Sequence, residues 1–239
     1  MEKIRKYLLN TLLIVLVFVG VALIFNKVIR NNLMSYETNK YQIQNVSKSN
    51  IGKNQKEQGN FDFDSVKSIN FKEILQSQID SQNLPVIGGI AVPDLGINLP
   101  IFKGVSNENL AYGAGTMKED QKMGQGNYTL ASHNVTGFNQ SVDLLFTPLE
   151  KAKKGMVIYI TDKDVVYHYK IDDVKVVNPN HIEVIEDHLK KQEITLITCA
   201  DPEAKQRIIV HGILEGSSSF DASDKSIQAA FEKKYNQIL

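Results

Sequence analysis

The chain has a single cysteine and no excess of charge of either sign. One cysteine among 239 residues excludes an internal disulfide, and a structural zinc site built on cysteines would need more thiols. The 27 Lys and Arg residues balance 27 Asp and Glu residues, so no nucleic-acid partner is predicted. Internal repeats are also lacking. The thiol of Cys199 is therefore either inert or chemically active.

A long apolar run is present at the N-terminus. Residues Tyr7 to Phe25 carry no charge and are long enough to cross a bilayer as one helix. Flanking Lys and Arg residues slightly favour a cytoplasmic N-terminus. A cleavable signal peptide is the alternative, but the length of the run favours an uncleaved anchor. We expect residues 1–30 to form a cytoplasmic tip and a transmembrane signal anchor, with the rest of the chain outside.

The next segment is polar. Residues 31–62 show no sustained helical or strand periodicity and are expected to form a flexible extracellular tether. Apolar side chains on one face predict a short helix in residues 64–79, with Asp64 as its cap. A closing helix is predicted over 223–239. We expect residues 63–239 to be the main folded domain, with a helix near each end.

After Leu84 the sequence consists of short β-branched runs separated by turn residues, which is typical of an all-β barrel or sandwich. Two strands are predicted on either side of the turn from Pro93 to Gly96. The later strand candidates are residues 127–133, 156–161, 165–177, 193–199 and 207–216. Leucines at helical spacing predict a helix within 141–155. Seven or eight strands result.

The cysteine ends one of these predicted strands. Asp201 and Pro202 are turn formers, so a simple hairpin would set Cys199 opposite Arg207. A nearby guanidinium stabilises a thiolate, and it can also donate hydrogen bonds to a carbonyl oxygen that gains charge during attack. This pattern indicates a nucleophile.

A thiol nucleophile needs a partner that accepts and returns a proton, which points to histidine. Of the five histidines, His133 ends the predicted strand 127–133, as Cys199 ends its own. Each residue alone has a plainer interpretation: a small buried hydrophobe for Cys199, a solvated charge for Arg207 and an ordinary histidine for His133. Their shared placement at strand ends favours function.

The motifs around these residues resemble those of the class A sortases, membrane-anchored cysteine transpeptidases of Gram-positive bacteria. "TLITC", which ends at Cys199, matches the family signature TLxTC. His133 in "LASHN" fits the histidine motif, and Arg207 fits the arginine that follows the cysteine. Residues 84–104 and 111–121 look especially like the streptococcal branch. The resemblance covers the anchor and residues 84–216, and it implies an eight-stranded β-barrel.

The resemblance also implies a reaction. Such enzymes cleave LPXTG-type sorting signals of secreted proteins between Thr and Gly and hold the new carboxyl group as a thioester. An amine of a cell-wall precursor, lipid II, then takes it, so the catalytic domain would lie outside a Gram-positive plasma membrane. Carried onto this chain, Cys199 is the nucleophile, His133 the acid and then the base, and Arg207 the group that stabilises the oxyanion. The active form is expected to be a thiolate-imidazolium pair.

A substrate groove is implied as well. Its residues would be Ala131, Ser132, Ile182, Val184, Ile197 and Thr198. The apolar members would form the walls for the Leu-Pro part of the signal, and Ser132 is a candidate polar contact. Ordinary core packing is the alternative for each apolar residue.

Some sortases of this class bind calcium through acidic side chains before the histidine motif. The expected positions hold Lys118, Gln121 and Gln125 here. Glu119 and Asp120 are the acids left nearby, whereas calcium prefers several carboxylates. We expect no calcium requirement and no other cofactor, although Asp187 could be one remaining ligand.

Two rival functions stay open. A pilin-polymerising sortase would carry a second, C-terminal transmembrane stretch or an N-terminal lid motif, and nothing after Gly216 is apolar enough to span a bilayer. A non-catalytic, membrane-tethered β-barrel would bind peptides and have a structural Cys199. Thiol reactivity separates this possibility from an enzyme.

Overall fold

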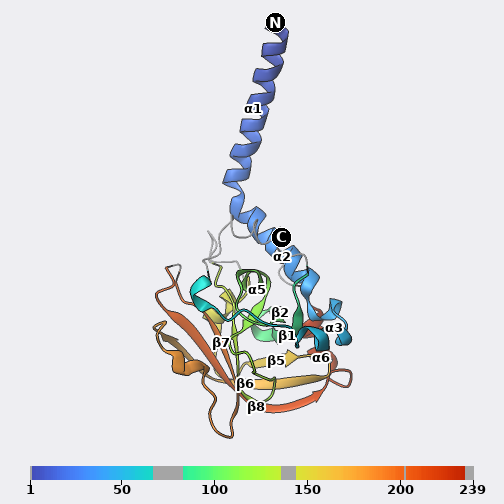
Figure 1. The fold of residues 1–239 in the computed structure, drawn as a ribbon, viewed down its shortest axis with the longest axis vertical. Helices are drawn as coiled ribbons and strands as arrows, with labels where there is room; N and C mark the ends of the chain where they lie inside the picture. Colours follow the sequence, from blue (N-terminus) through green and yellow to red (C-terminus); the bar gives the residue numbers. More distant parts are fainter. Residues whose placement is uncertain (1, 67–82, 136–143, 202, 235–239) are drawn as a thin grey trace.

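The computed structural model describes residues 2–66, 83–135, 144–201 and 203–234. Its first helix, α1 (Glu2–Ile24), projects away from the rest of the molecule (Figure 1). An 18-residue window within the span from Lys3 to Ile24 has a mean hydropathy of 2.6, and none of its residues is buried by the rest of the protein. A helix of this length and composition can cross a membrane.

Helices also follow α1. They are α2 (Asn26–Tyr41), η1 (Ile43–Asn45), α3 (Lys48–Asn54) and η2 (Phe63–Ser65). Met34 and Ile43 are fully or almost fully buried, and the ring of Tyr41 lies 5.8 Å from that of Phe102. This packing corrects the expectation of an irregular tether over 31–62. Most of the buried residues described in α2 are polar or charged, so hydropathy does not reveal this face; they are Arg30, Asn31, Ser35, Glu37 and Thr38.

The rest of the chain forms a closed barrel of eight strands. They are β1 (Val86–Val92), β2 (Ile97–Phe102), β3 (Ala114–Thr116), β4 (Gly126–Ala131), β5 (Val157–Thr161), β6 (Val165–Val177), β7 (Gln192–Cys199) and β8 (Arg207–Ser219). Their order around the barrel is β1-β2-β3-β4-β7-β8-β6-β5. The predicted β-barrel is confirmed. The turn between β1 and β2 contains η3 (Pro93–Leu95) and ends at Gly96, whose φ of 67° favours glycine.

The remaining elements are short. They are α5 (Asn107–Tyr112), η4 (Thr147–Lys151), η5 (Ile182–Ile185) and α6 (Lys225–Glu232). In the described part of 141–155 the helix is only η4, where a longer one was expected. Most of the helix predicted over 64–79 lies outside the described residues. Helix α6 falls within the predicted closing helix, whose last residues are also outside them.

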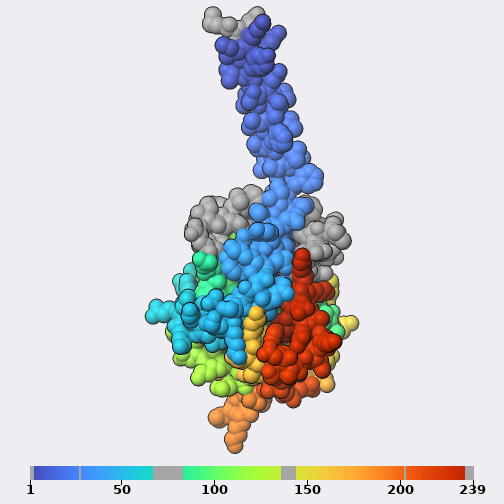
Figure 2. Space-filling model, turned by 90° about the vertical axis from the view of Figure 1, so that its right-hand side faces the viewer, coloured from blue at the N-terminus to red at the C-terminus, as the bar shows by residue number. Residues whose placement is uncertain are grey.

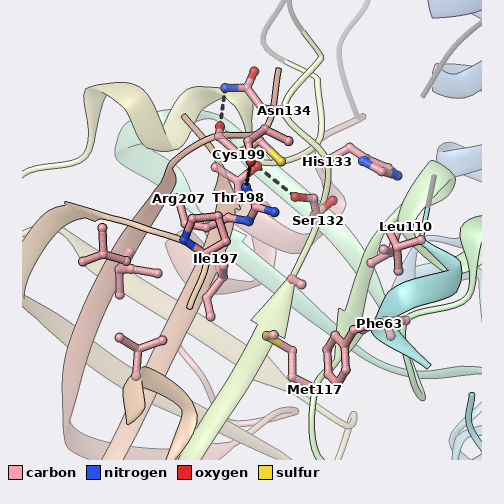
Figure 3. Close-up of a pocket in the computed structure, with 18 of the residues that line it drawn as sticks. Phe63, Leu110, Met117, Ser132, His133, Asn134, Ile197, Thr198, Cys199 and Arg207 are labelled. Atoms are coloured by element: carbon pink, nitrogen blue, oxygen red, sulfur yellow. Dashed lines mark hydrogen bonds between the residues drawn. The ribbon is translucent and has the colours of Figure 1, made fainter. Parts of the chain in front are cut away.

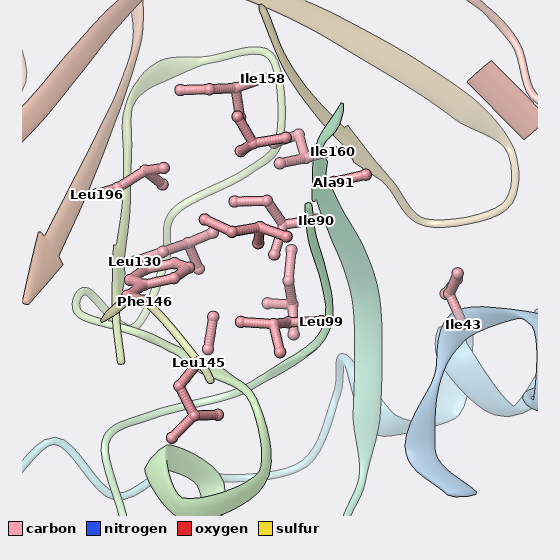
Figure 4. Packing of buried hydrophobic residues seen from close by; sticks show 14 of the residues in the cluster. Ile43, Ile90, Ala91, Leu99, Leu130, Leu145, Phe146, Ile158, Ile160 and Leu196 are labelled. Carbon is pink, nitrogen blue, oxygen red and sulfur yellow. The ribbon is translucent and has the colours of Figure 1, made fainter. Parts of the chain in front are cut away.

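The core fills the barrel from several strands at once. Figure 4 shows side chains of Ile90, Leu99, Leu130 and Leu196 converging with Phe146, all of them fully or almost fully buried. The N-terminal helices and the C-terminal segment lie side by side on the outer surface (Figure 2), where Gln42 Nε2 donates to the Lys233 carbonyl at 3.3 Å. The closed, packed barrel gives the strand ends a rigid frame.

Candidate active site

Strands β7 and β8 form the predicted hairpin. Cys199 is directly opposite Arg207 in their antiparallel register. The turn between them is held by Asp201, whose carboxylate accepts from the backbone N–H of Lys205 at 3.0 Å and of Gln206 at 2.8 Å. The predicted placement of Cys199 opposite Arg207 is therefore confirmed, and it follows from the backbone register.

Strand β4 brings His133 to the same edge. It runs parallel to β7, with Ala131 opposite Ile197. The chain then continues beside β7, because Ser132 N donates to the Ile197 carbonyl at 3.2 Å and Thr198 Oγ1 donates to the Ser132 carbonyl at 2.8 Å. His133 follows two residues after the end of β4, where the sequence pattern had placed it within the strand.

Asn134 links the histidine segment to the cysteine strand. Its Nδ2 donates to the Cys199 carbonyl at 2.8 Å and to Glu150 Oε1 at 2.7 Å, and Figure 3 shows the first of these bonds beside the thiol. Phe146 N also donates to the His133 carbonyl at 3.1 Å. Sequence reasoning missed Asn134, although it immediately follows the chosen histidine.

The strand ends border a cavity of about 670 Å³. Its lining includes all nine predicted site residues, namely Ala131, Ser132, His133, Ile182, Val184, Ile197, Thr198, Cys199 and Arg207. It also includes Arg30, Phe63, Asp64 and Val66 from the N-terminal segment. These four were not predicted, because their segment carries no recognisable motif.

The thiol of Cys199 is partly buried. Burial raises its pKa, the positive charge of Arg207 lowers it, and Asp201 raises it further. The net direction is upward. In this conformation Cys199 is therefore a neutral thiol at neutral pH, with Arg207 opposing the cost of ionisation.

His133 is also neutral. Protein atoms surround the ring, although part of the residue's surface is exposed, and this burial lowers the pKa of His133 to about 4. Figure 3 shows its ring directed away from the sulfur of Cys199 and toward the side of the cavity that holds Leu110 and Phe63. The two groups share the cavity, but in this rotamer the imidazole does not face the thiol.

Arg207 keeps part of its guanidinium available. Nη1 donates to the carbonyls of Ala204 at 2.7 Å and Gln206 at 3.1 Å, which fixes the side chain across the loop. Among the described residues it pairs with no carboxylate. Its remaining N–H groups can therefore donate to a bound carbonyl oxygen.

An ammonium group occupies the region where the calcium site was considered. Lys118 Nζ lies 2.6 Å from Asp187 Oδ1, and the same oxygen accepts from Asn127 N at 2.7 Å. Asn127 Nδ2 donates to the carbonyls of Val184 at 3.0 Å and Glu186 at 3.2 Å. Together these bonds tie η5, which lines the cavity, to β4. In the described part of the chain no three His, Cys, Asp or Glu residues are grouped to hold a metal ion.

Comparison with known proteins gives consistent similarities. Residues 90–215 match the family described as "Sortase domain". The chain is 57% identical to Sortase A of Streptococcus agalactiae over 228 residues, which is 95% of this chain and 92% of that protein. It is 37% identical to Sortase A of Listeria monocytogenes over 207 residues, or 86% and 91% of the two chains.

Solved structures have the same fold. The structure of Listeria monocytogenes sortase A matches with a TM-score of 0.56 and 39% identity, over 62% of this chain and 99% of that one. Sortase C-3 of Streptococcus pneumoniae matches with a TM-score of 0.57 over 82% and 96% of the two chains. At 17% identity, the second similarity concerns the fold alone.

Proposed function

The chain belongs to the sortase family, in the class A streptococcal type, and from this premise we propose how its cavity performs cysteine transpeptidation. It is a cysteine transpeptidase, and α1 fits a membrane anchor. We assign the nucleophile to Cys199, the proton transfers to His133 and oxyanion stabilisation to Arg207. The pairing of Cys199 with Arg207 at the edge of a cavity that also holds His133 is the observation that carries this assignment.

The proposed substrate is an LPXTG-type sorting signal. In the first step the thiol of Cys199 passes its proton to His133, the sulfur attacks the carbonyl carbon of the Thr residue, and the carbonyl electrons move onto oxygen. Arg207 donates hydrogen bonds to that oxygen, where charge develops. The tetrahedral intermediate then collapses, and the bond to the Gly nitrogen breaks as His133 gives that nitrogen a proton. A thioester on Cys199 remains.

The second step reverses these roles. An amine of the cell-wall precursor attacks the thioester carbonyl, and neutral His133 accepts the proton that the amine loses. The bond from carbon to sulfur breaks and restores the Cys199 thiolate. The products are a new amide and the free enzyme, so one histidine supplies and recovers one proton in each cycle.

The protonation states of Cys199 and His133 set a condition for the first step. The pKa of Cys199 is raised and that of His133 is about 4, so the resting pair is neutral. A thiolate-imidazolium pair requires the proton to pass from sulfur to nitrogen, and therefore requires the imidazole to turn toward Cys199. Mutual attraction of the two charges would then favour the ionised pair.

The groove residues divide into two kinds. Ala131, Ile182, Val184 and Ile197 offer apolar surface in the cavity and are proposed to accept the Leu-Pro part of the signal. The hydroxyl groups of Ser132 and Thr198 already donate to backbone carbonyls, at 2.6 Å and 2.8 Å. We therefore propose that these two residues hold the frame of the groove through their hydroxyls.

The remaining proposals concern the membrane topology of the chain and the two rival functions. A cytoplasmic N-terminus and an outer catalytic domain would put the cavity on the side where secreted proteins and cell-wall precursors meet. The pilin-polymerising and the non-catalytic alternatives are not favoured, because the relatives named Sortase A match almost the whole chain.

The test uses the full chain in detergent micelles with an LPXTG-type peptide, with and without an amine acceptor. Wild type should cleave between Thr and Gly, and the acceptor should divert product from hydrolysis to transfer. Cys199→Ala should reduce both to background while its unfolding temperature stays unchanged. Retention of cleavage by the folded Cys199→Ala protein would refute the assignment of the nucleophile.

A further inference from the structure

Arg30 is a buried cation in the cavity lining that the reaction above does not use. It lies in α2, and only 8% of its surface is exposed. Nε and Nη2 both donate to Asn31 Oδ1, at 3.1 and 3.0 Å. In the part of the chain that the structure describes, Nη1 has no acceptor and Arg30 forms no ion pair with a carboxylate.

Burying the guanidinium of Arg30 without an anionic partner costs folding free energy. A guanidinium removed from water loses hydration, and one neutral amide oxygen compensates only part of that loss. Burial accordingly lowers the pKa of Arg30. Asp64 also lines the cavity, but it forms no ion pair with Arg30. An anionic ligand in the cavity would supply the missing charge, and a planar guanidinium suits phosphate oxygens in particular.

The position of Arg30 indicates where such an anion would come from. It follows Ile24, the last residue of the apolar span, by six residues. Along a helix that separation is about 9 Å. Figure 1 shows α2 between α1 and the barrel. This side of the cavity therefore lies near the membrane surface, where a ligand held by a lipid would enter.

The two substrates of the proposed reaction differ in whether they carry a phosphate group and a lipid. The sorting signal is a peptide segment with no phosphate. A lipid-linked cell-wall precursor carries phosphate groups where its lipid joins its soluble part, and its amine has to reach Cys199. A cation near the membrane end of the cavity is therefore suited to the second substrate.

We propose that Arg30 binds a phosphate group of the membrane-linked acceptor and so holds its amine toward the thioester on Cys199. This inference rests on the proposed function, because it assigns a residue to the second half of that reaction. Asn31 positions the guanidinium through Oδ1.

The experiment compares wild type with Arg30→Gln as full chains in micelles of a zwitterionic detergent. Three rates are measured: thioester hydrolysis without acceptor, transfer to a soluble stem-peptide amine, and transfer to the phosphate-bearing lipid-linked acceptor. The first two should change less than about twofold. The KM for the lipid-linked acceptor should rise about 10- to 100-fold, the range for losing a charged hydrogen bond. Arg30→Lys should restore part of the loss.

Lys40→Gln is the matched control, because Lys40 lies on the same helix and its side chain is half exposed. It should leave all three rates unchanged. Equal losses in all three rates of Arg30→Gln would show a structural role and overturn the inference. An unchanged KM for the lipid-linked acceptor would overturn it too.

Phospholipid headgroups offer the same phosphate chemistry. Added phosphatidylglycerol should not alter the effect of Arg30→Gln, and an effect that follows phosphatidylglycerol content with every acceptor would assign Arg30 to the bilayer and overturn the inference. Absence of thioester formation in wild type would instead contradict the proposed function, so the two failures are distinguishable.

Discussion

The two ends of strand β7 differ in whether the charged side chains there have partners of opposite charge. Near its start, Glu193 is 1% exposed, and its carboxylate lies 2.7 Å from His188 Nδ1, 3.4 Å from His211 Nε2 and 3.5 Å from Lys191 Nζ. At its other end, Cys199 faces Arg207, which has no carboxylate partner among the described residues. One strand thus carries a neutralised cluster at one end and an unneutralised cation at the other.

We infer from this difference that the cluster around Glu193 contributes to stability and that Arg207 contributes to the reaction. A buried carboxylate with several basic neighbours is stable only while they surround it, so such a cluster ties elements together. His211 Nδ1 extends it to Asp172 on β6, at 2.6 Å. A guanidinium that is not paired with a carboxylate can stabilise a group that becomes negative only during the reaction. Substitutions at the two ends should therefore have different consequences.

The largest expected effect is at the reactive end. Arg207→Gln removes the cation that would stabilise the oxyanion, and kcat/KM for peptide cleavage should fall about 10²- to 10³-fold. Its free energy of unfolding should fall by only about 0.5–1.5 kcal/mol, from the loss of the hydrogen bonds of Nη1 to the loop carbonyls. Steady-state kinetics and urea unfolding check both values. Activity within threefold of wild type would contradict the role assigned to Arg207.

The next effect is at the neutralised end. Glu193→Gln keeps the shape of the side chain but leaves its basic neighbours without their buried anion, which should cost about 1–3 kcal/mol of unfolding free energy. Peptide cleavage by the folded fraction should remain within about threefold of wild type, because Glu193 is remote from the thiol along β7. Urea unfolding measures the loss. A stable but inactive variant would break the comparison between the two ends.

A smaller effect is expected at the ammonium group of Lys118, which pairs with Asp187 just after η5. Lys118→Met removes the ion pair with Asp187, whose side chain is 63% exposed, so the unfolding free energy should fall by about 1 kcal/mol or less, which urea unfolding would measure.

The same ammonium group bears on calcium. Activity of wild type should not respond to calcium or to a chelator. Calcium-stimulated activity in wild type would contradict the account of this site.

The smallest effect concerns the pH dependence of thiol reactivity. Burial raises the pKa of Cys199 and Arg207 opposes it, so loss of the positive charge should move the pKa further up. The rate of alkylation by iodoacetamide should therefore rise with pH at a higher midpoint in Arg207→Gln than in wild type. A shift to lower pH would exclude a stabilising effect of Arg207 on the thiolate.

Much of the barrel was predictable because its strands carry strong local signals. The turn from Pro93 to Gly96 and the hairpin that pairs Cys199 with Arg207 follow from turn chemistry and period-two alternation. Strand β3 could not be found in this way, since three residues hold too little pattern.

The surroundings of the site were less predictable. Helix α2 packs through a largely polar face, so its contribution of Arg30 to the cavity depends on tertiary contacts that no local pattern encodes. The bond from Asn134 to the Cys199 carbonyl likewise depends on the parallel pairing of β4 with β7, which joins strands distant in sequence. Sequence motifs identified the candidate reacting groups and the groove residues but not Arg30 or Asn134.

The most direct test of the central claim is to trap the acyl-enzyme. The full chain is mixed with an LPXTG-type peptide, quenched in acid within the first turnover, digested and examined by mass spectrometry. The account predicts an adduct whose mass equals the peptide through its Thr residue, attached to Cys199 and lost on addition of an amine. Cleavage of the peptide without such an adduct, or an adduct on another residue, would contradict it.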